Sequence, residues 1–165
     1  MGFVTYPDPA LTARAEPSVV DARLVAVGQQ LIAAAAEVKA YGLAGAHIGV
    51  VSPVVVLNVA PQAAAPDYRP FYNPRIIAVA TETESGIEGS VSLPGVEVAV
   101  ERPVWVEIAY DDESGTARSA RFEGFVARCA LHEIEQVEGH FFLERVSRLK
   151  REMALKKFAK QRRAG

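Results

Sequence analysis

The sequence contains a single cysteine, Cys129, and no uninterrupted apolar run approaches the roughly 18 residues that a membrane-spanning helix requires. One cysteine excludes an internal disulfide framework, so we expect a reducing, cytoplasmic location. The segment Met1–Tyr6 has neither a basic region nor an apolar core, and no signal peptide is expected. These absences favour a single globular domain over residues 1–165.

Charge is distributed unevenly along the chain. The formal net charge is −2, yet residues 145–165 hold nine Lys or Arg and one acidic residue. The sequence predicts a basic C-terminal helix over 145–165, with Ser147 as its N-terminal cap. Such a run is typical of a solvated helix face, and it also suits the ribosome or another anionic surface. We expect no membrane contact and no specific DNA binding.

Two further helices are predicted from periodicity and end signals. Apolar residues recur at helical spacing over Ser18–Lys39, and Ser18 with Asp21 resembles an N-terminal cap. A second helix is predicted from Gly124 to about Glu138, because Gly139 is a typical residue just beyond a helix end.

Short β-rich segments lie between these helices. The predicted strands are Val54–Asn58, Ile76–Val79, Val96–Val100, Val104–Tyr110 and Thr116–Phe122. The segment Asp111–Gly115 is predicted to join the last two as a hairpin, Gln62–Pro70 to be an irregular loop, and Tyr41–Val50 to be a Gly/Ala turn. Helices at both ends and in the middle, around short strands, predict an α+β fold.

The most informative segment is Leu131–Gln136, where the predicted middle helix carries His132 followed by Glu133. In metal hydrolases with a His-Glu-x-x-His helix, two imidazoles at i and i+4 bind the metal and the Glu acts as general base. Here the residue four positions after His132 is Gln136. The helix therefore predicts the frame of a catalytic metal site that lacks one imidazole.

Three segments in this order are similar to the motifs of the peptide deformylase family, whose members remove the formyl group from N-terminal formylmethionine. The family pattern Gly-x-Gly-Leu-Ala-Ala-x-Gln corresponds to Ala40–His47, Glu-Gly-Cys-Leu-Ser to Glu88–Ser92, and His-Glu-x-Asp-His to His132–Gln136. The resemblance covers nearly the whole chain. It implies short mixed and antiparallel strands around a central metal-site helix, with helices at both termini.

The resemblance implies a divalent metal, often Fe²⁺, held by one Cys, two His and a water. Carried over, the ligand positions are Ser90, His132 and Gln136. A serine hydroxyl stays protonated near neutral pH, and an amide oxygen is a weak ligand for Fe, Zn or Ni. His132 alone would bind a metal weakly. We therefore expect no bound cofactor unless the site is rebuilt from other residues.

The family chemistry implies roles for further residues. Glu133 stands at the position of the general base, and His47 with the backbone N–H of Val91 at the positions that polarise the formyl oxygen. The resemblance also implies substrate contacts at Gly42 and Arg102. The departures from the family pattern fall on the metal ligands Ser90 and Gln136 and, in the first motif, on Ala40 for Gly and His47 for Gln.

Two alternatives to a lost metal site remain open. In the first, His47, His132 and one of Glu133 or Gln136 form a rebuilt site for Fe, Zn or Ni. In the second, Ser90 acts as a nucleophile activated by His132, with Glu133 or Glu88 as the acid and the Val91 N–H as an oxyanion donor.

Several of these residues also have structural interpretations. His132 is expected to be hydrogen-bonded to Gln136 or Ser90 if it binds no metal, and Arg102 to pair with Glu101 or Glu107 if it does not bind substrate. Cys129 is expected to be a small core residue. His140 lies about 12 Å further along a helix than His132 and is excluded as a ligand.

We therefore predict a peptide deformylase-like protein with degenerate metal ligands. We expect its deformylase activity to be lost or strongly reduced, which would make it a pseudoenzyme linked to translation. It is expected to keep a cleft for a formyl-peptide or another small acyl ligand, and the ribosome is a second expected partner through the basic helix. An active amide hydrolase is the alternative.

Overall fold

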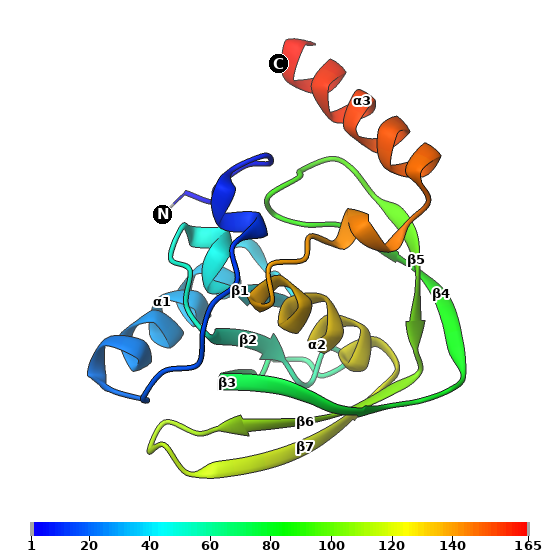
Figure 1. Ribbon diagram of the computed structural model, residues 1–165. Helices are drawn as coiled ribbons and strands as arrows, with labels where there is room; N and C mark the ends of the chain where they lie inside the picture. The colour runs from blue at the N-terminus through cyan, green and yellow to red at the C-terminus, as the bar shows by residue number, and fades with distance from the viewer. Residues whose placement is uncertain (1, 165) are drawn as a thin grey trace.

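Helix α2 (Gly124–Val137) occupies the centre of the fold (Figure 1). The computed structural model describes residues 2–164. The strands of the larger sheet are β1 (Gly42–Ala44), β2 (Val54–Asn58), β3 (Tyr68–Val79), β6 (Trp105–Asp111) and β7 (Ala117–Glu123). They are ordered β1-β2-β3-β6-β7, and every neighbouring pair is antiparallel. This architecture confirms the predicted α+β fold.

Strand β2 shows how the sheet is covered on both faces. All five of its residues are buried, and successive side chains of a strand point to opposite faces. Val54 and Val56 join the apolar cluster of α1 (Ala22–Val38), whereas Val55 and Leu57 join the cluster of α2. The continuous apolar run of β2 thus reflects a strand between two helices.

The N-terminus of α1 differs from the prediction. The helix begins at Ala22, and the Asp21 carboxylate accepts a hydrogen bond from the N–H of Leu24 at 2.9 Å. Asp21 is therefore the cap. Ser18 lies before the helix, and its N–H donates to the side chain of Asn73.

A separate two-stranded antiparallel sheet is formed by β4 (Thr83–Glu88) and β5 (Val98–Pro103). Strand β4 was not predicted, because only Glu88 among its six residues is buried and no apolar alternation marks it. Strand β5 begins two residues later than expected. This hairpin carries the second family-like motif at its end.

Two loop predictions were wrong. Strand β3 begins at Tyr68, so the predicted loop Gln62–Pro70 ends in a strand that runs past Ile76. The predicted Gly/Ala turn contains β1 and the 3-10 helix η2 (Gly45–Ile48). Small residues allow this short strand to approach its neighbours closely. Small residues are also typical of turns, so the sequence alone did not distinguish the strand from a turn.

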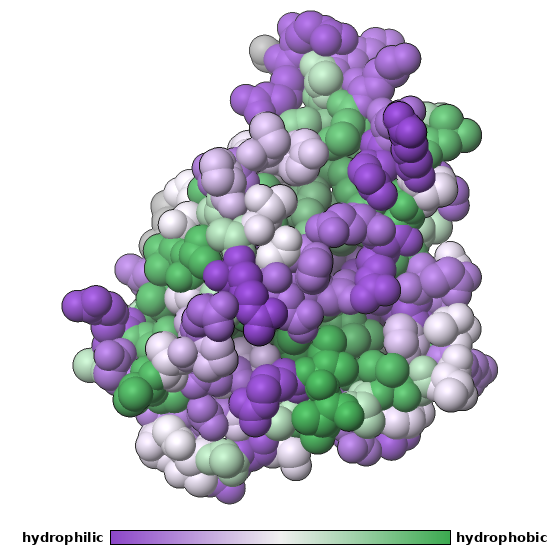
Figure 2. Space-filling view, in the orientation of Figure 1, coloured by the Kyte–Doolittle hydropathy of each residue, from purple (hydrophilic) through white to green (hydrophobic). Residues whose placement is uncertain are grey.

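Beyond α2, the short apolar segment folds as the 3-10 helix η3 (Phe142–Arg145) and leads to the C-terminal helix α3 (Arg148–Ala164). Ser147 accepts a hydrogen bond from the N–H of Lys150, which confirms its predicted capping role. Helix α3 projects from the body and is strongly hydrophilic (Figures 1 and 2). Within residues 2–164, no helix is both long and apolar enough to cross a membrane.

Candidate functional site

A cavity of about 470 Å³ lies among the three family-like motifs. Tyr41, Gly42 and Leu43, at the edge strand β1, form one wall, and residues 87–91 at the end of β4 form the opposite wall. Helix α2 contributes five lining residues, namely Phe125, Arg128, Cys129, His132 and Glu133. The topology therefore gathers motifs that are distant in sequence.

His132 is oriented by Glu88 from the opposite wall. The Nδ1 atom of His132 lies 2.8 Å from Oε1 of Glu88, so Nδ1–H donates to the carboxylate and Nε2 is left free. The expected partners, Gln136 and Ser90, are not the ones used. Burial lowers the pKa of His132, but the carboxylates of Glu133 and Glu88 outweigh burial and raise it above its ordinary value.

Glu88 is itself held by two buried guanidinium groups. Arg102 donates through Nε and Nη2 at 2.8 and 2.9 Å, and Arg128 donates through Nη1 at 2.8 Å. Burial alone would raise the pKa of Glu88, but the hydrogen bonds from Arg102 and His132 lower it to about 2. Glu88 is therefore an anion that fixes the ring of His132.

The second partner of Arg102 is Glu135, at 2.6 Å from Nη1. The predicted ion pairs with Glu101 or Glu107 are thus wrong. Arg102 is buried and does not line the cavity. Its guanidinium donates hydrogen bonds to Glu88 and Glu135, and the substrate contact expected at Arg102 stays a prediction.

His47 comes from η2, next to the edge strand β1. Its Nδ1 accepts a hydrogen bond from the N–H of Ala44 at 3.0 Å, as a side chain in the first turn of a helix satisfies a free backbone donor. Burial lowers the pKa of His47 to about 3, and the charge of the nearby His132 adds to this shift. The neutral ring therefore carries its proton on Nε2, which is buried and has no hydrogen-bond partner in the described part of the chain.

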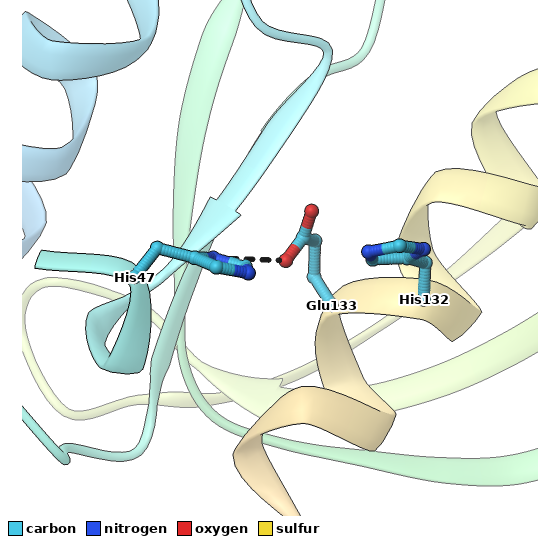
Figure 3. Close-up of side chains that lie close together, drawn as sticks. All are labelled: His47, His132 and Glu133. Carbon is cyan, nitrogen blue, oxygen red and sulfur yellow. Dashed lines mark ion pairs between the residues drawn. The ribbon is translucent and has the colours of Figure 1, made fainter. Parts of the chain in front are cut away.

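Glu133 points between the two histidines (Figure 3). Its Oε1 lies 3.6 Å from Nδ1 of His47 and has no hydrogen-bond partner among residues 2–164. Burial raises the pKa of Glu133 to about 7, although His132 opposes the shift. A buried carboxyl without a donor is costly to ionise, which explains the direction. Near neutral pH this group can hold or release a proton.

Three potential metal-ligand atoms, one each from His47, His132 and Glu133, lie within 4.8 Å of one another. Two imidazoles and a carboxylate form a donor set found in catalytic zinc sites. The tautomer of His47 fits less well. A metal on either ring nitrogen would require His47 to give up the hydrogen bond that its Nδ1 accepts from Ala44. The donor types and spacing suit a divalent metal, whereas the present hydrogen bonding of His47 does not.

The other two family ligand positions are engaged elsewhere. Gln136 is buried, and its Nε2 donates to the carbonyl of Leu11 at 2.7 Å. Ser90 lines the cavity, but its Oγ accepts a hydrogen bond from the N–H of Ser92 at 3.1 Å. No hydrogen bond joins Ser90 to His132 within residues 2–164, so the arrangement needed for a Ser90 nucleophile is not formed.

The remaining predicted residues take different positions. Val91 and Gly42 line the cavity, and a side chain at Gly42 would come within 3.1 Å of Cγ of Glu133. Cys129 packs against the core of α2 and also borders the cavity, and burial raises the pKa of its thiol to about 12. His140 is exposed beside Glu144, outside the cavity, as predicted.

The residues that the sequence did not reveal are Arg128 and Glu135. Arg128 precedes His132 by four positions and therefore lies on the same face of α2. Glu135 bridges Arg102 to Arg145 of η3. The i, i+4 spacing was the one available signal for Arg128, and the pairing of Glu135 depends on contacts between distant segments.

Known proteins are similar to this chain in both sequence and fold. The family described as polypeptide deformylase matches residues 1–152. A peptide deformylase-like protein of Rhizobium meliloti is 39% identical over 163 residues, 98% of this chain and 93% of that protein. A peptide deformylase of Agrobacterium fabrum is 32% identical over 163 residues, 98% of this chain and 96% of its own length.

The structural similarity extends over the same length. The crystal structure of peptide deformylase from Ehrlichia chaffeensis matches with a TM-score of 0.91 at 27% sequence identity. That alignment covers 99% of this chain and 97% of the other. The cavity, the histidine and glutamate of α2, and these similarities place the chain in the polypeptide deformylase family.

Proposed function

We propose that this protein binds the acylated N-terminus of a peptide, with formyl-methionyl peptides as the first class to test, and that its hydrolysis of the formyl group is lost or strongly reduced. The observation that carries the proposal is the placement of Gln136. Its amide donates to the carbonyl of Leu11, where the family has an imidazole for the metal.

The chemistry of the two substituted positions supports the loss of hydrolysis. The Ser90 hydroxyl is a poor ligand because it remains protonated near neutral pH, and it already accepts a hydrogen bond from Ser92. A full set of structural zinc ligands contributes roughly 10–16 kcal/mol of binding free energy. Replacing two of three protein ligands should therefore remove most of the affinity for metal.

The shape of the cavity supports retained binding. Its volume of about 470 Å³ is suited to a side chain with an acyl group. Strand β1 is the edge of its sheet, and Gly42 and Leu43 border the cavity, so an extended peptide can add to this edge by main-chain hydrogen bonds. Tyr41, Ile87 and Phe125 supply exposed apolar surface at the rim.

Two assays on the same protein test this proposal. Isothermal titration with formyl-Met-Ala-Ser should give a measurable Kd, while formate release stays at the background rate. Glu133→Ala is the control, because it removes the family general base. Robust formate release by the wild type that disappears in Glu133→Ala would overturn the proposal, and so would an absence of peptide binding.

A second candidate function rests on the grouping of His47, His132 and Glu133 within 4.8 Å. In this alternative the three residues hold Fe, Zn or Ni, and the protein is an amide hydrolase with a rebuilt site. When bound, the metal would supply Lewis-acid polarisation. We rank it second because His47 must give up its hydrogen bond from Ala44.

Metal analysis distinguishes the two candidates. Protein purified without oxygen or chelator should contain well under one equivalent of metal if the first proposal holds. About one equivalent that falls sharply in His47→Gln would favour the rebuilt site, because glutamine can still accept from Ala44 but is a weaker ligand. The control Gln161→Ala on α3 should leave the metal content unchanged.

We also propose that α3 docks the protein on the ribosome. The helix projects from the body, and only Ala154 and Phe158 of its side chains are buried. Its surface is mostly hydrophilic (Figure 2), and its Lys and Arg side chains can contact an anionic surface. Co-sedimentation with ribosomes should weaken as salt rises. The proposal fails if removing residues 148–165 leaves co-sedimentation unchanged.

A further inference from the structure

The hairpin β4–β5 forms one wall of the cavity, and within the described range 2–164 it shares no strand pairing with the larger sheet. Backbone hydrogen bonds of the linking residues, Ala80 to Trp105 and Val104 to Glu82, join it to β3 and β6, and side chains connect it to α2. Arg128, buried on α2, extends toward this hairpin. This one side chain donates hydrogen bonds to both strands of the hairpin.

On β5, Arg128 donates from Nη1 to the carbonyl of Val100 at 2.7 Å. On β4, it donates from Nη2 to the carbonyl of Glu84 at 2.9 Å and from Nη1 to the Glu88 carboxylate at 2.8 Å. A buried guanidinium is tolerated only when its donors are satisfied. Here the acceptors that satisfy it belong to the hairpin.

Gly86 supplies the space for this contact. It stands opposite Val100 in the β4–β5 register. A Cβ at Gly86 would lie 2.6 Å from Cζ of Arg128, and the nearest atoms it would meet all belong to that guanidinium. The absence of a side chain at Gly86 and the length of Arg128 are thus matched to each other.

The contact also bears on the cavity. Arg128 borders the cavity directly, and its hydrogen-bond partner Glu88 also orients His132, which lies one turn further along the same face of α2. Ile87 and Gly89, on either side of Glu88, form the wall that faces β1. Any shift of the hairpin away from α2 would widen the space between these walls.

We propose that Arg128 is a positioning residue that clamps the β4–β5 hairpin to α2, and that the clamp sets which N-terminal side chain the cavity accepts. The clamp itself follows from the contacts of Arg128. Its effect on ligand selection rests on the proposed peptide-binding function. The two parts are tested by separate measurements.

Amide hydrogen exchange of residues 83–103 tests the clamp without any ligand. Hydrogen bonds to charged groups are worth about 1.5–3 kcal/mol, so Arg128→Met should speed exchange in both strands by roughly 10- to 100-fold. Arg121→Met, which removes an exposed arginine of β7, is the matched control. Unchanged exchange in the hairpin of Arg128→Met would overturn the clamp.

A double-mutant cycle with Gly86→Ala tests the direct contact. Gly86→Ala should speed hairpin exchange in the wild-type background and have little further effect in Arg128→Met, because its steric partner is gone. Additive effects would contradict the contact. Arg128→Lys keeps the charge and serves if Arg128→Met does not fold. Wild-type exchange in Arg128→Lys would show that charge alone is sufficient and would overturn the clamp.

Selection is measured as the ratio of Kd values for formyl-Ala-Ala-Ser and formyl-Met-Ala-Ser. We expect Arg128→Met to reduce this ratio by about an order of magnitude relative to wild type. A ratio that stays constant while both peptides bind more weakly would indicate a merely structural role and overturn the second part. If the wild type binds neither peptide, the proposed function and the selection part fail together, and the exchange data still decide the clamp.

Discussion

The side chain of Gln136 donates to the carbonyl of Leu11 at 2.7 Å, one helical turn beyond His132 on α2. This bond joins the central helix to the 3-10 helix η1 (Pro9–Thr12) near the N-terminus. A residue at a family ligand position thus serves packing between distant segments. Restoring an imidazole there would remove a buried hydrogen bond as well as add a ligand.

The first prediction concerns restoration of the family ligands. Ser90→Cys combined with Gln136→His should raise the affinity for Fe²⁺ or Zn²⁺ by more than about 100-fold, because a thiolate and an imidazole replace two weak ligands. Metal titration with a chelating competitor measures this change, and formate release is expected to rise with it. Ser90→Cys alone is the control and should do little. Tight metal binding without any gain in hydrolysis would mean that the cavity itself has diverged.

The second prediction follows from the burial of Glu133, whose pKa is raised from 4.5 to about 7. A raised carboxyl pKa favours the folded state while the group is protonated, and this advantage is lost as the pH rises toward and through 7. In metal-free protein, Glu133→Gln should therefore gain roughly 2–3 kcal/mol of unfolding free energy relative to wild type between about pH 5 and about pH 8.

Urea unfolding of both proteins across that range measures the difference. Glu152→Gln, on the exposed α3, provides a matched loss of one carboxylate. The difference curve must be taken between variant and wild type, because His47 acts in the opposite direction. Its lowered pKa makes the folded state more stable as the pH rises from about 3 toward 6.5. A flat difference curve for Glu133→Gln would contradict the buried, uncompensated carboxyl.

The third prediction concerns Glu88, the carboxylate shared by Arg102, Arg128 and His132. Glu88→Ala should cost about 3–5 kcal/mol of unfolding free energy, because two guanidinium groups would remain buried without this partner. Glu101 is exposed and lies one residue before Arg102. Glu101→Ala should cost less than about 1 kcal/mol of unfolding free energy. Chemical denaturation at neutral pH measures both, and equal small losses would contradict the network.

The same carboxylate predicts acid sensitivity. Because the folded-state pKa of Glu88 is lowered from 4.5 to about 2, its contribution is present above 4.5 and is lost as the pH falls toward 2. The loss amounts to roughly 3 kcal/mol. Acid unfolding of Glu88→Gln should therefore show a weaker dependence on pH over this interval than the wild type. An identical dependence in both proteins would exclude Glu88 as its source.

Periodicity predicted the elements whose burial follows a regular pattern. Helices α1 and α2 show apolar residues at helical spacing, and the apolar run Val54–Asn58 forms a strand covered on both faces. Strand β4 escaped prediction because its side chains are mostly exposed and its position depends on Arg128. The local sequence of β4 does not contain the donor, Arg128 of α2, whose hydrogen bonds hold this strand.

The sequence predicted which residue types take part in the site, because this depends on the identity of single residues. One alternative from the sequence grouped His47 and His132 with either Glu133 or Gln136, and the structure brings His47, His132 and Glu133 together. Their hydrogen-bond partners were not predictable, because Glu88 and Ala44 reach them through the arrangement of separate elements. Tautomer and pKa depend on those partners, so the ionisation of the site required the structure.

The proposed function requires that the cavity bind a formylated N-terminus and leave its formyl group intact. Proton NMR of formyl-Met-Ala-Ser with protein purified without oxygen or chelator follows both events in one sample. We predict saturation transfer from the protein to the formyl proton, weakened by the cavity substitution Gly42→Ala, and no growing formate signal. Steady formate production that Glu133→Ala abolishes, or a formyl proton that receives no saturation, would contradict the claim.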